Sequence, residues 1–288
     1  MSVDKLQEKV RKLKNPSVID FSVTPAQIPP HLLEQEASTC KAYGRFCLEL
    51  LGGLKGIVPA VRFSYSWFSL YGMEGLGILK ELLQEAKSMG FYVLLDCPES
   101  LSLLAAEHTA QALITLPCDG LVVTAYIGSD ALTPYVNQLK ATGKSLFVIL
   151  RTGNKTAQQL QDLMTGSRLM HMAAADIVNR LGEGLVGRSG YSQVAAIGAA
   201  NAADSIRTLR AKYKNMYLLL EGYDYPNANA KNCSFAFDKL GHGAAACAGA
   251  SVTAAWSVEQ TDGTAFVEQA VQAAERMRKN LTRYITVL

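Results

Sequence analysis

The residue with the clearest chemical potential in this chain stands directly after a short apolar run. Residues 91–95 (FYVLL) are continuously apolar, and Asp96 follows them. Such a run is typical of a parallel strand that is buried on both faces. Because α/β folds place their functional groups at the carboxyl ends of strands, Asp96 is the candidate catalytic residue, suited to proton transfer or charge stabilisation.

Other polar side chains follow the remaining apolar runs in the same way. Two of them are arginines, whose guanidinium groups pair well with carboxylates and phosphates, so an anionic ligand is predicted. Glu221, Ser251 and Thr253 occupy comparable strand ends. The candidate ligand-binding residues are Asp20, Ser22, Arg62, Thr124, Tyr126, Arg151, Thr152, Asn154, Gly222 and Tyr223.

Several kinds of chemistry have no candidate in the sequence. No lysine stands at a predicted strand end, so Schiff-base chemistry is not expected. The four histidines form no spaced pair and the six cysteines form no C-x-x-C pair, so no metal site is predicted. A divalent ion shared by Asp96, Glu99 and Glu221 is the one alternative.

The strands that must position these side chains recur along the whole chain. They are predicted over residues 17–21, 56–63, 91–96, 120–125, 145–150, 193–198 and 216–220, with an eighth inside 244–253. Helical stretches separate them, including residues 31–51, 67–88, 101–112, 156–181 and 263–284. Eight such units with no linker predict an α/β fold, a (β/α)8 TIM barrel, in one domain over residues 1–288. A doubly wound sheet is the alternative, but no G-x-G-x-x-G turn follows the first strand.

Composition excludes several classes of partner. The chain is 49% hydrophobic and carries a formal net charge of +3. In the amino-terminal helix, about residues 3–13, lysines and arginines alternate with acids and leucines, so a solvated face is predicted rather than a nucleic-acid patch. No apolar run reaches the roughly 18 residues of a membrane helix. The charged amino terminus is unlike a secretory signal, and a cytoplasmic protein with reduced thiols is expected.

Six stretches, in order and at matching spacing, resemble the orotidine 5'-phosphate decarboxylase family, in particular its longer bacterial branch. They are VIDFSVTPAQIP (18–29), RFSYSWFSLYG (62–72), VVTAYIG (122–128), LRTGN (150–154), AIGAA (196–200) and LLEGY (219–223). The last four are similar to the family's V-x-P-Y-x-G, A-R-T-S-N, V-V-G-A-T and L-V-P-G-Y-G. The resemblance covers nearly the whole chain.

This resemblance implies the barrel fold and a lyase of pyrimidine biosynthesis that works without metal or cofactor. The family converts orotidine 5'-phosphate to UMP with a charged network. An Asp follows the first strand, a Lys follows the second, and D-x-K-x-x-D follows the third. The lysine of that last motif protonates the carbanion left when carbon dioxide departs.

Most of that network does not carry over to this chain. Asp96 matches the first Asp of the strand-three motif, but its lysine falls on Pro98 and its second Asp on Leu101. The first-strand Asp falls on Ser22, close to Asp20, and the second-strand Lys falls on Arg62. The phosphate-binding turn reads GYDYPN (222–227), and the phosphate arginine has no counterpart in 248–250.

We therefore expect a pseudoenzyme: a decarboxylase-like barrel with a ligand-binding, regulatory or assembly role and a small anionic or nucleotide-like ligand. One alternative is an enzyme with altered chemistry that uses Asp96, Arg62 and Arg151 on another small anionic substrate. Another is an active decarboxylase whose lysine comes from elsewhere, for example Lys231 or Lys239.

A homodimer is also implied by the resemblance. The family's barrels pair through the rims that carry their sites, and the second Asp of the strand-three motif is shared across that interface. Leu101 replaces this charge. A more apolar contact near Leu101 is expected.

Overall fold

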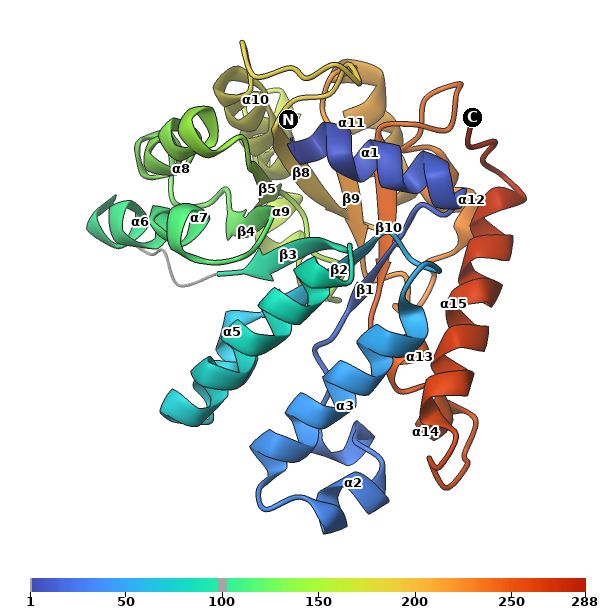
Figure 1. The fold of residues 1–288 in the computed structure, drawn as a ribbon. Helices are drawn as coiled ribbons and strands as arrows, with labels where there is room; N and C mark the ends of the chain where they lie inside the picture. The colour runs from blue at the N-terminus through green and yellow to red at the C-terminus, as the bar shows by residue number, and fades with distance from the viewer. Residues whose placement is uncertain (1, 98–102) are drawn as a thin grey trace.

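Eight parallel strands close into a barrel in the computed structural model, which describes residues 2–97 and 103–288 (Figure 1). Around the barrel the strands follow the order β1, β10, β9, β8, β5, β4, β3, β2, and β2 then pairs with β1. Their bounds are β1 (Ser17–Asp20), β2 (Ala60–Ser64), β3 (Tyr92–Asp96), β4 (Gly120–Thr124), β5 (Ser145–Ile149), β8 (Val194–Ala199), β9 (Leu218–Glu221) and β10 (Ala244–Ala248). The predicted (β/α)8 TIM barrel is confirmed.

Burial explains why these runs form barrel strands. Every residue of β8 and β10 is buried, and the other six strands are buried up to a half-exposed final residue. Strands covered on both faces select continuous apolar sequence. Because the last residue of the other six strands is partly exposed, polar side chains can gather at the carboxyl end.

Helices surround the barrel, and most follow a strand (Figure 1). The larger ones are α1 (Ser2–Leu13), α3 (Thr39–Leu54), α5 (Gly72–Ser88), α6 (Leu103–Ala110), α8 (Ser129–Thr142), α10 (Met170–Leu181), α11 (Ala203–Lys212) and α15 (Phe266–Thr282). The short ones are η1 (Pro25–Gln27), α2 (Pro30–Gln35), α4 (Tyr65–Ser69), α7 (Ala112–Thr115), α9 (Gln158–Gln161), α12 (Ala230–Ser234), α13 (Ala250–Thr253) and α14 (Ala255–Val258).

Helix boundaries depart from the sequence prediction at local breaks. The predicted helix 31–51 is two helices because Ser38 caps α3, its side chain accepting a hydrogen bond from the Lys41 amide. The predicted helix 67–88 divides into α4 and α5 at Gly72, whose φ of 63° is left-handed. The predicted start of helix 101–112 lies outside the described residues.

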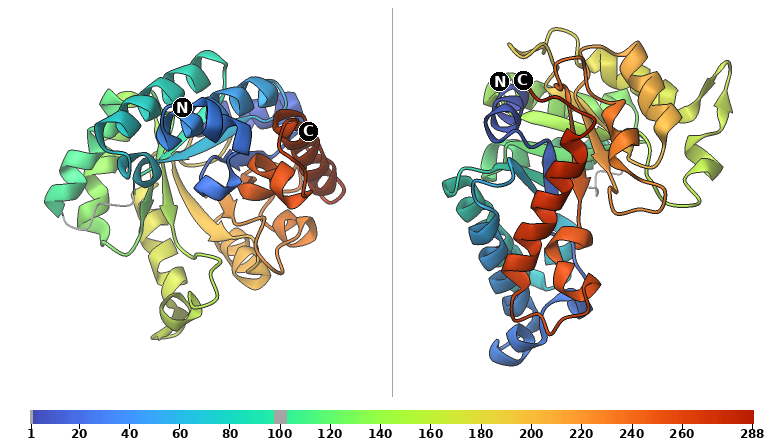
Figure 2. Two further views of the ribbon diagram at one scale, coloured as in Figure 1. Left: turned by 90° about the horizontal axis from the view of Figure 1, so that it is seen from below. Right: turned by 90° about the vertical axis from the view of Figure 1, so that its right-hand side faces the viewer.

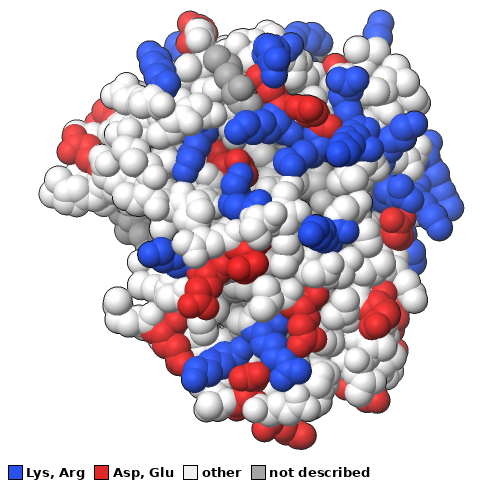
Figure 3. Space-filling model, in the orientation of Figure 1, with Lys and Arg blue, Asp and Glu red and all other residues white. Residues whose placement is uncertain are grey.

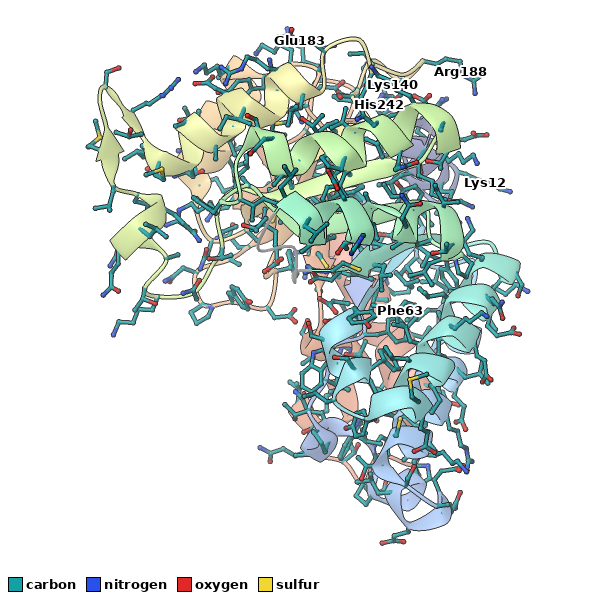
Figure 4. All side chains as sticks on the ribbon, turned by 90° about the vertical axis from the view of Figure 1, so that its left-hand side faces the viewer. Lys12, Phe63, Lys140, Glu183, Arg188 and His242 are labelled. Carbon is teal, nitrogen blue, oxygen red and sulfur yellow. The ribbon has the colours of Figure 1, made fainter. Side chains whose placement is uncertain are left out.

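The prediction of one long helix over residues 156–181 is wrong for the first half of that stretch. It contains α9, then a hairpin of β6 (Met164–Thr165) and β7 (Arg168–Leu169), and only then α10. Gly166, with φ of 64°, turns the hairpin. This segment projects away from the barrel in the right-hand view of Figure 2 and again in Figure 4.

Helix α1 closes the amino end of the barrel. Val3, Leu6 and Val10 are fully buried beneath it. The Ser2 hydroxyl donates to the Asp119 carbonyl, and the Gly243 amide donates to Gln7 Oε1. Since those partners precede β4 and β10, α1 seals the face opposite the strand ends that carry the candidate site.

The outer face of α1 is charged. Figure 3 shows Lys and Arg side chains gathered over the upper part of the molecule, where α1 lies, with acidic side chains among them. Figure 4 labels Lys12, near the end of α1, and His242 in the upper part of the same view. Across residues 2–97 and 103–288, no helix combines the length and apolar character needed to cross a membrane.

Candidate functional site

A buried arginine at the carboxyl end of β2 organises the mouth of the barrel. The Arg62 side chain is only 6% exposed, and its Nη1 lies 2.9 Å from Glu221 Oε2 and 3.7 Å from Asp20 Oδ2. Its Nη2 forms an ion pair with Asp96 Oδ2. The neighbouring strands β1 and β3 supply Asp20 and Asp96, whereas Glu221 comes from β9 farther around the barrel. These four residues are the Arg62 cluster.

Charge in the Arg62 cluster is unbalanced, with three carboxylates around one cation. Burial on its own lowers the pKa of Arg62, but the charges of Asp96, Asp20 and Glu221 outweigh it and raise the pKa well above its ordinary value. A guanidinium in this state stays protonated and donates no proton at neutral pH. Arg62 can orient and neutralise carboxylates, and it cannot act as a general acid.

Asp96 is a carboxyl of the cluster whose pKa is raised by its surroundings. Burial raises the pKa of Asp96 above its usual range, and the opposing charge of Arg62 only partly offsets this. Among the described residues, the buried Asp96 Oδ1 and Arg62 Nε have no hydrogen-bond partner. Unpaired polar atoms in a core are costly, so the two atoms are places where the cluster lacks full hydrogen bonding.

Asp96→Asn is expected to reduce the pH dependence of folding stability. Because the folded state keeps a proton on Asp96 above its ordinary pKa of 3.8 while the unfolded chain loses it, stability falls as pH rises through this window. Asparagine does not titrate, so the variant should lose less stability than the parent as pH rises above the ordinary pKa of 3.8. Urea unfolding at each pH measures this. Asp204→Asn is the matched control because its side chain is 97% exposed, and equal pH slopes for both variants would contradict the assignment.

The loop after β9, residues 222–229, is tied across the mouth of the barrel by Asp224. The Gly249 and Ser251 amides donate to Asp224 Oδ2 at 2.7 and 3.3 Å, and the Ser251 hydroxyl donates to Oδ1. Asn201 Nδ2 donates to the Gly153 carbonyl at 3.0 Å and to the Pro226 carbonyl at 3.4 Å. The Asp224 carboxylate therefore accepts the hydrogen bonds of two backbone amides that follow β10.

Tyr225 of the same loop covers two glycines. A Cβ added to Gly153 or Gly222 would lie 2.3 or 2.4 Å from the Tyr225 ring, so only glycine lets the ring approach this closely. Burial raises the pKa of Tyr225, and the charges of Glu221, Arg62 and Asp20 also act on it. The ring thus lies against Gly222, next in the chain to Glu221 of the Arg62 cluster.

The candidates that follow β5 form a separate cluster. Arg151 Nε and Nη2 donate to the two oxygens of Asp162 at 2.9 and 2.7 Å. The Thr152 amide donates to Gln161 Oε1 at 2.8 Å, and the Thr152 hydroxyl donates to Asn154 Oδ1 at 2.6 Å. Arg151, Thr152 and Asn154 therefore hold the α9 segment in place rather than joining Asp96.

Of the remaining predicted ligand-binding residues, Tyr223 lies away from the Arg62 cluster and Ser22 lies beside it. Tyr223 lines a cavity of about 510 Å³ together with Asn280 and Arg283, on the side of α15. Ser22 donates its amide to Asp20 Oδ1 at 2.9 Å, so it supports the Arg62 cluster from one side.

Thr124 and Tyr126 follow β4. The Tyr126 amide donates to Thr124 Oγ1 at 3.3 Å, and the Tyr126 hydroxyl donates to the Leu150 carbonyl at 2.6 Å. Burial raises the pKa of Tyr126 to about 12, so its phenol stays neutral at ordinary pH. The Tyr126 side chain therefore contacts the segment that follows β5 and not the Arg62 cluster.

Sequence reasoning missed Asp224 and Tyr225 as the residues that cover the mouth. Their positions in GYDYPN were noted as a departure from the family's turn, which was the available signal. It also missed the contacts of Asp162 and His171, because nothing in the pattern distinguishes them from surface helix residues. Within the part of the chain that the structure describes, no group of three or more His, Cys, Asp or Glu side chains could hold a metal ion. Glu99 and Leu101 lie outside that part.

Comparison with known proteins agrees with this architecture. No family model matches the chain. It is 25% identical over 286 residues to the orotidine 5'-phosphate decarboxylase of Petrotoga mobilis, covering 98% of each protein.

Two solved structures share the barrel. The Plasmodium berghei orotidine 5'-monophosphate decarboxylase has a TM-score of 0.75 at 14% identity, with 95% of this chain and 98% of that one covered. The Methanocaldococcus jannaschii enzyme, complexed with inhibitor BMP, has a TM-score of 0.61 at 12% identity, covering 91% and 98%. The predicted resemblance is thus confirmed: nearly the whole chain is similar in sequence to orotidine 5'-phosphate decarboxylases, and it has their (β/α)8 barrel fold.

Proposed function

We propose that this protein is a decarboxylase-like barrel that does not decarboxylate orotidine 5'-phosphate. The observation that carries the proposal is the state of Arg62, the cation at the end of β2. Three carboxylates hold it, and it cannot release a proton at neutral pH. A reaction that ends in protonation of a carbanion needs a positioned general acid.

Two further features support this reading. The place of the family's lysine is occupied by Pro98, which has no ionisable group, although its position lies outside the described residues. Asp224 accepts hydrogen bonds from the amides of Gly249 and Ser251, and the Tyr225 ring lies against Gly153 and Gly222. Side chains of the loop after β9 therefore pack against the segments that follow β5, β9 and β10.

The direct test is an assay of purified protein with orotidine 5'-phosphate, followed by the loss of its absorbance. No turnover above the uncatalysed background supports the proposal. Sustained turnover contradicts it.

A small anionic or nucleotide-like ligand is the second part of the proposal. The buried donor Arg62 Nε, which has no hydrogen-bond partner among the described residues, supports it, and so does the inhibitor complex of the M. jannaschii protein. A thermal-shift screen with UMP, orotidine 5'-phosphate and other sugar phosphates tests it. A ligand at 100 times its dissociation constant adds about 2.7 kcal/mol to the free energy of unfolding. No shift with any of them would leave assembly as the remaining role.

Assembly as a homodimer is the third part of the proposal. Leu103 and Leu104, at the start of α6, are 45% and 62% exposed, next to the position of Leu101. Apolar side chains exposed together beside a barrel rim are typical of a protein interface. The contact is therefore expected to include Leu104.

Leu104→Asp is expected to weaken the dimer strongly. Burying an unpaired carboxylate at an interface is unfavourable, and every 1.4 kcal/mol lost raises the dissociation constant about tenfold. Light scattering should give about twice the chain mass of 31.1 kDa for the parent and a mass nearer that of one chain for the variant. Leu240→Asp is the matched control, because Leu240 is 50% exposed and precedes β10 at the other end of the barrel. A monomeric parent at micromolar concentration would rule the dimer out.

A further inference from the structure

A second polar cavity lies beside the barrel, where the segments after β5 and β8 meet. Its volume is about 490 Å³, and its lining includes Arg151, Asp162, His171, Asn201 and Ser205. No member of the Arg62 cluster contributes to that lining. This cavity therefore lies apart from the Arg62 cluster.

Three side chains in this cavity are joined in a line. Ser205 Oγ lies 3.0 Å from His171 Nε2. On the other side of the imidazole, Nδ1 lies 2.9 Å from the Gln161 carbonyl oxygen and 3.1 Å from Asp162 Oδ1. A hydroxyl within hydrogen-bond reach of a base, with the base oriented by a third group, is the geometry of an activated nucleophile.

The contacts of Nδ1 decide the tautomer of His171. Both neighbours of Nδ1 are oxygen acceptors, so Nδ1 carries the proton. Nε2 then has a free lone pair and accepts the hydrogen bond from the Ser205 hydroxyl. The side chain of His171 is 2% exposed, so the imidazole is held in this orientation by the packed segment around it.

Asp162 and Arg151 are positioning residues for this arrangement. Arg151 donates to both oxygens of Asp162, which fixes the plane of the carboxylate. The hydrogen bonds from Arg151 lower the pKa of Asp162 against the effect of burial. The carboxylate therefore stays ionised beside Nδ1.

The helix that carries Ser205 supplies hydrogen-bond donors. Ser205 lies in the first turn of α11, a helix of ten residues whose N-cap residue Ala202 makes no side-chain cap. Amides of a first helical turn have no acceptor within the helix, and the helix dipole places partial positive charge there. Such donors can stabilise the oxyanion of a tetrahedral intermediate.

We propose that Ser205 and His171 hydrolyse small carboxylic esters in this cavity. Ser205 Oγ bonds to the ester carbonyl carbon while its proton passes to His171 Nε2. Collapse of the tetrahedral intermediate breaks the bond to the alcohol oxygen, which takes that proton and leaves. Water then attacks the acyl-serine with His171 as base, and the carboxylic acid and free serine are formed without any oxidant or reductant.

The test uses the full-length protein with p-nitrophenyl acetate and with a fluorophosphonate probe. We expect hydrolysis above the buffer background and a phosphonate adduct on Ser205, located by mass spectrometry of the digested protein. Ser205→Ala should abolish the adduct at this position and lower the hydrolysis rate by about 10²–10⁴-fold, as removal of a general-base-assisted nucleophile does. His171→Gln should lower both.

The matched control is Ser88→Ala, an exposed serine at the end of α5, before β3 and so at the opposite end of the barrel. It should leave labelling and hydrolysis unchanged. Thermal unfolding of each variant verifies that it is folded, and labelling of the unmodified protein needs no variant at all. Absence of an adduct on Ser205 in the folded parent, or hydrolysis that persists in Ser205→Ala, overturns the proposal whatever the outcome with orotidine 5'-phosphate.

Discussion

Purified protein is expected to leave orotidine 5'-phosphate unconverted. Positioned general-acid catalysis contributes about 10²–10⁴-fold, and preorganised charges around it contribute more. The resemblance to the family's motifs places the lysine on Pro98 and the partner aspartates on Ser22 and Leu101. Arg62 is protonated and held by three carboxylates, so it offers no substitute. The loss of orotidine absorbance over time measures the result.

Two variants sharpen this test. Pro98→Lys alone should not restore turnover, because the flanking carboxylates that position the lysine would still be absent. The raised pKa of Asp96 favours the protonated carboxyl, which is a proton donor. Robust turnover by the parent that disappears in Asp96→Ala would overturn the proposal and favour an active decarboxylase.

Arg62→Met should destabilise the fold by about 3–5 kcal/mol at neutral pH, the range seen when one partner of a buried ion pair is removed. The side chain of Arg62 is 6% exposed, and its loss leaves Asp20, Asp96 and Glu221 close together without a counter-charge. Urea unfolding near neutral pH measures the difference in free energy.

The pH dependence of the stability of Arg62→Met tests whether repulsion among the three carboxylates causes the loss. Without Arg62, mutual repulsion raises the pKa values of the three carboxyls in the folded state above their unfolded values. Stability is then lost as pH rises through the raised values and is regained at acid pH. The deficit should thus be smaller at about pH 5 than at about pH 8.

Arg168→Met is the matched control for the same substitution. Arg168 is 50% exposed and pairs with Asp176 on the surface, where an ion pair is worth about 0–1 kcal/mol. A similar loss for both variants, or a deficit for Arg62→Met that does not change with pH, would contradict the assigned role of Arg62.

The sequence by itself determined the barrel. The eight apolar runs predict strands that are buried on both faces, and burial of this kind depends on side-chain type and order alone. Polar residues after each run predict which side chains gather at the carboxyl end, because parallel strands end at one face. Asp20, Arg62 and Asp96 meet there for that reason.

Helix boundaries were less predictable, because a single residue decides them. Ser38 and Gly72 divide two predicted helices through a cap and a left-handed φ, and the hairpin at Gly166 interrupts a third. Apolar periodicity continues across such positions, so the pattern does not reveal the break.

Tertiary structure alone decided which candidates share a site. Arg62 lies within β2 and Arg151 two residues after β5, and one pairs with Asp20, Asp96 and Glu221 whereas the other pairs with Asp162. The choice depends on where distant segments return to the rim. Residues 151 and 162 meet because the end of α9 folds back against the segment that follows β5. The approach of Ser205 to His171, 34 positions earlier, arises in the same way, since it depends on the packing of two helices and not on spacing within either one.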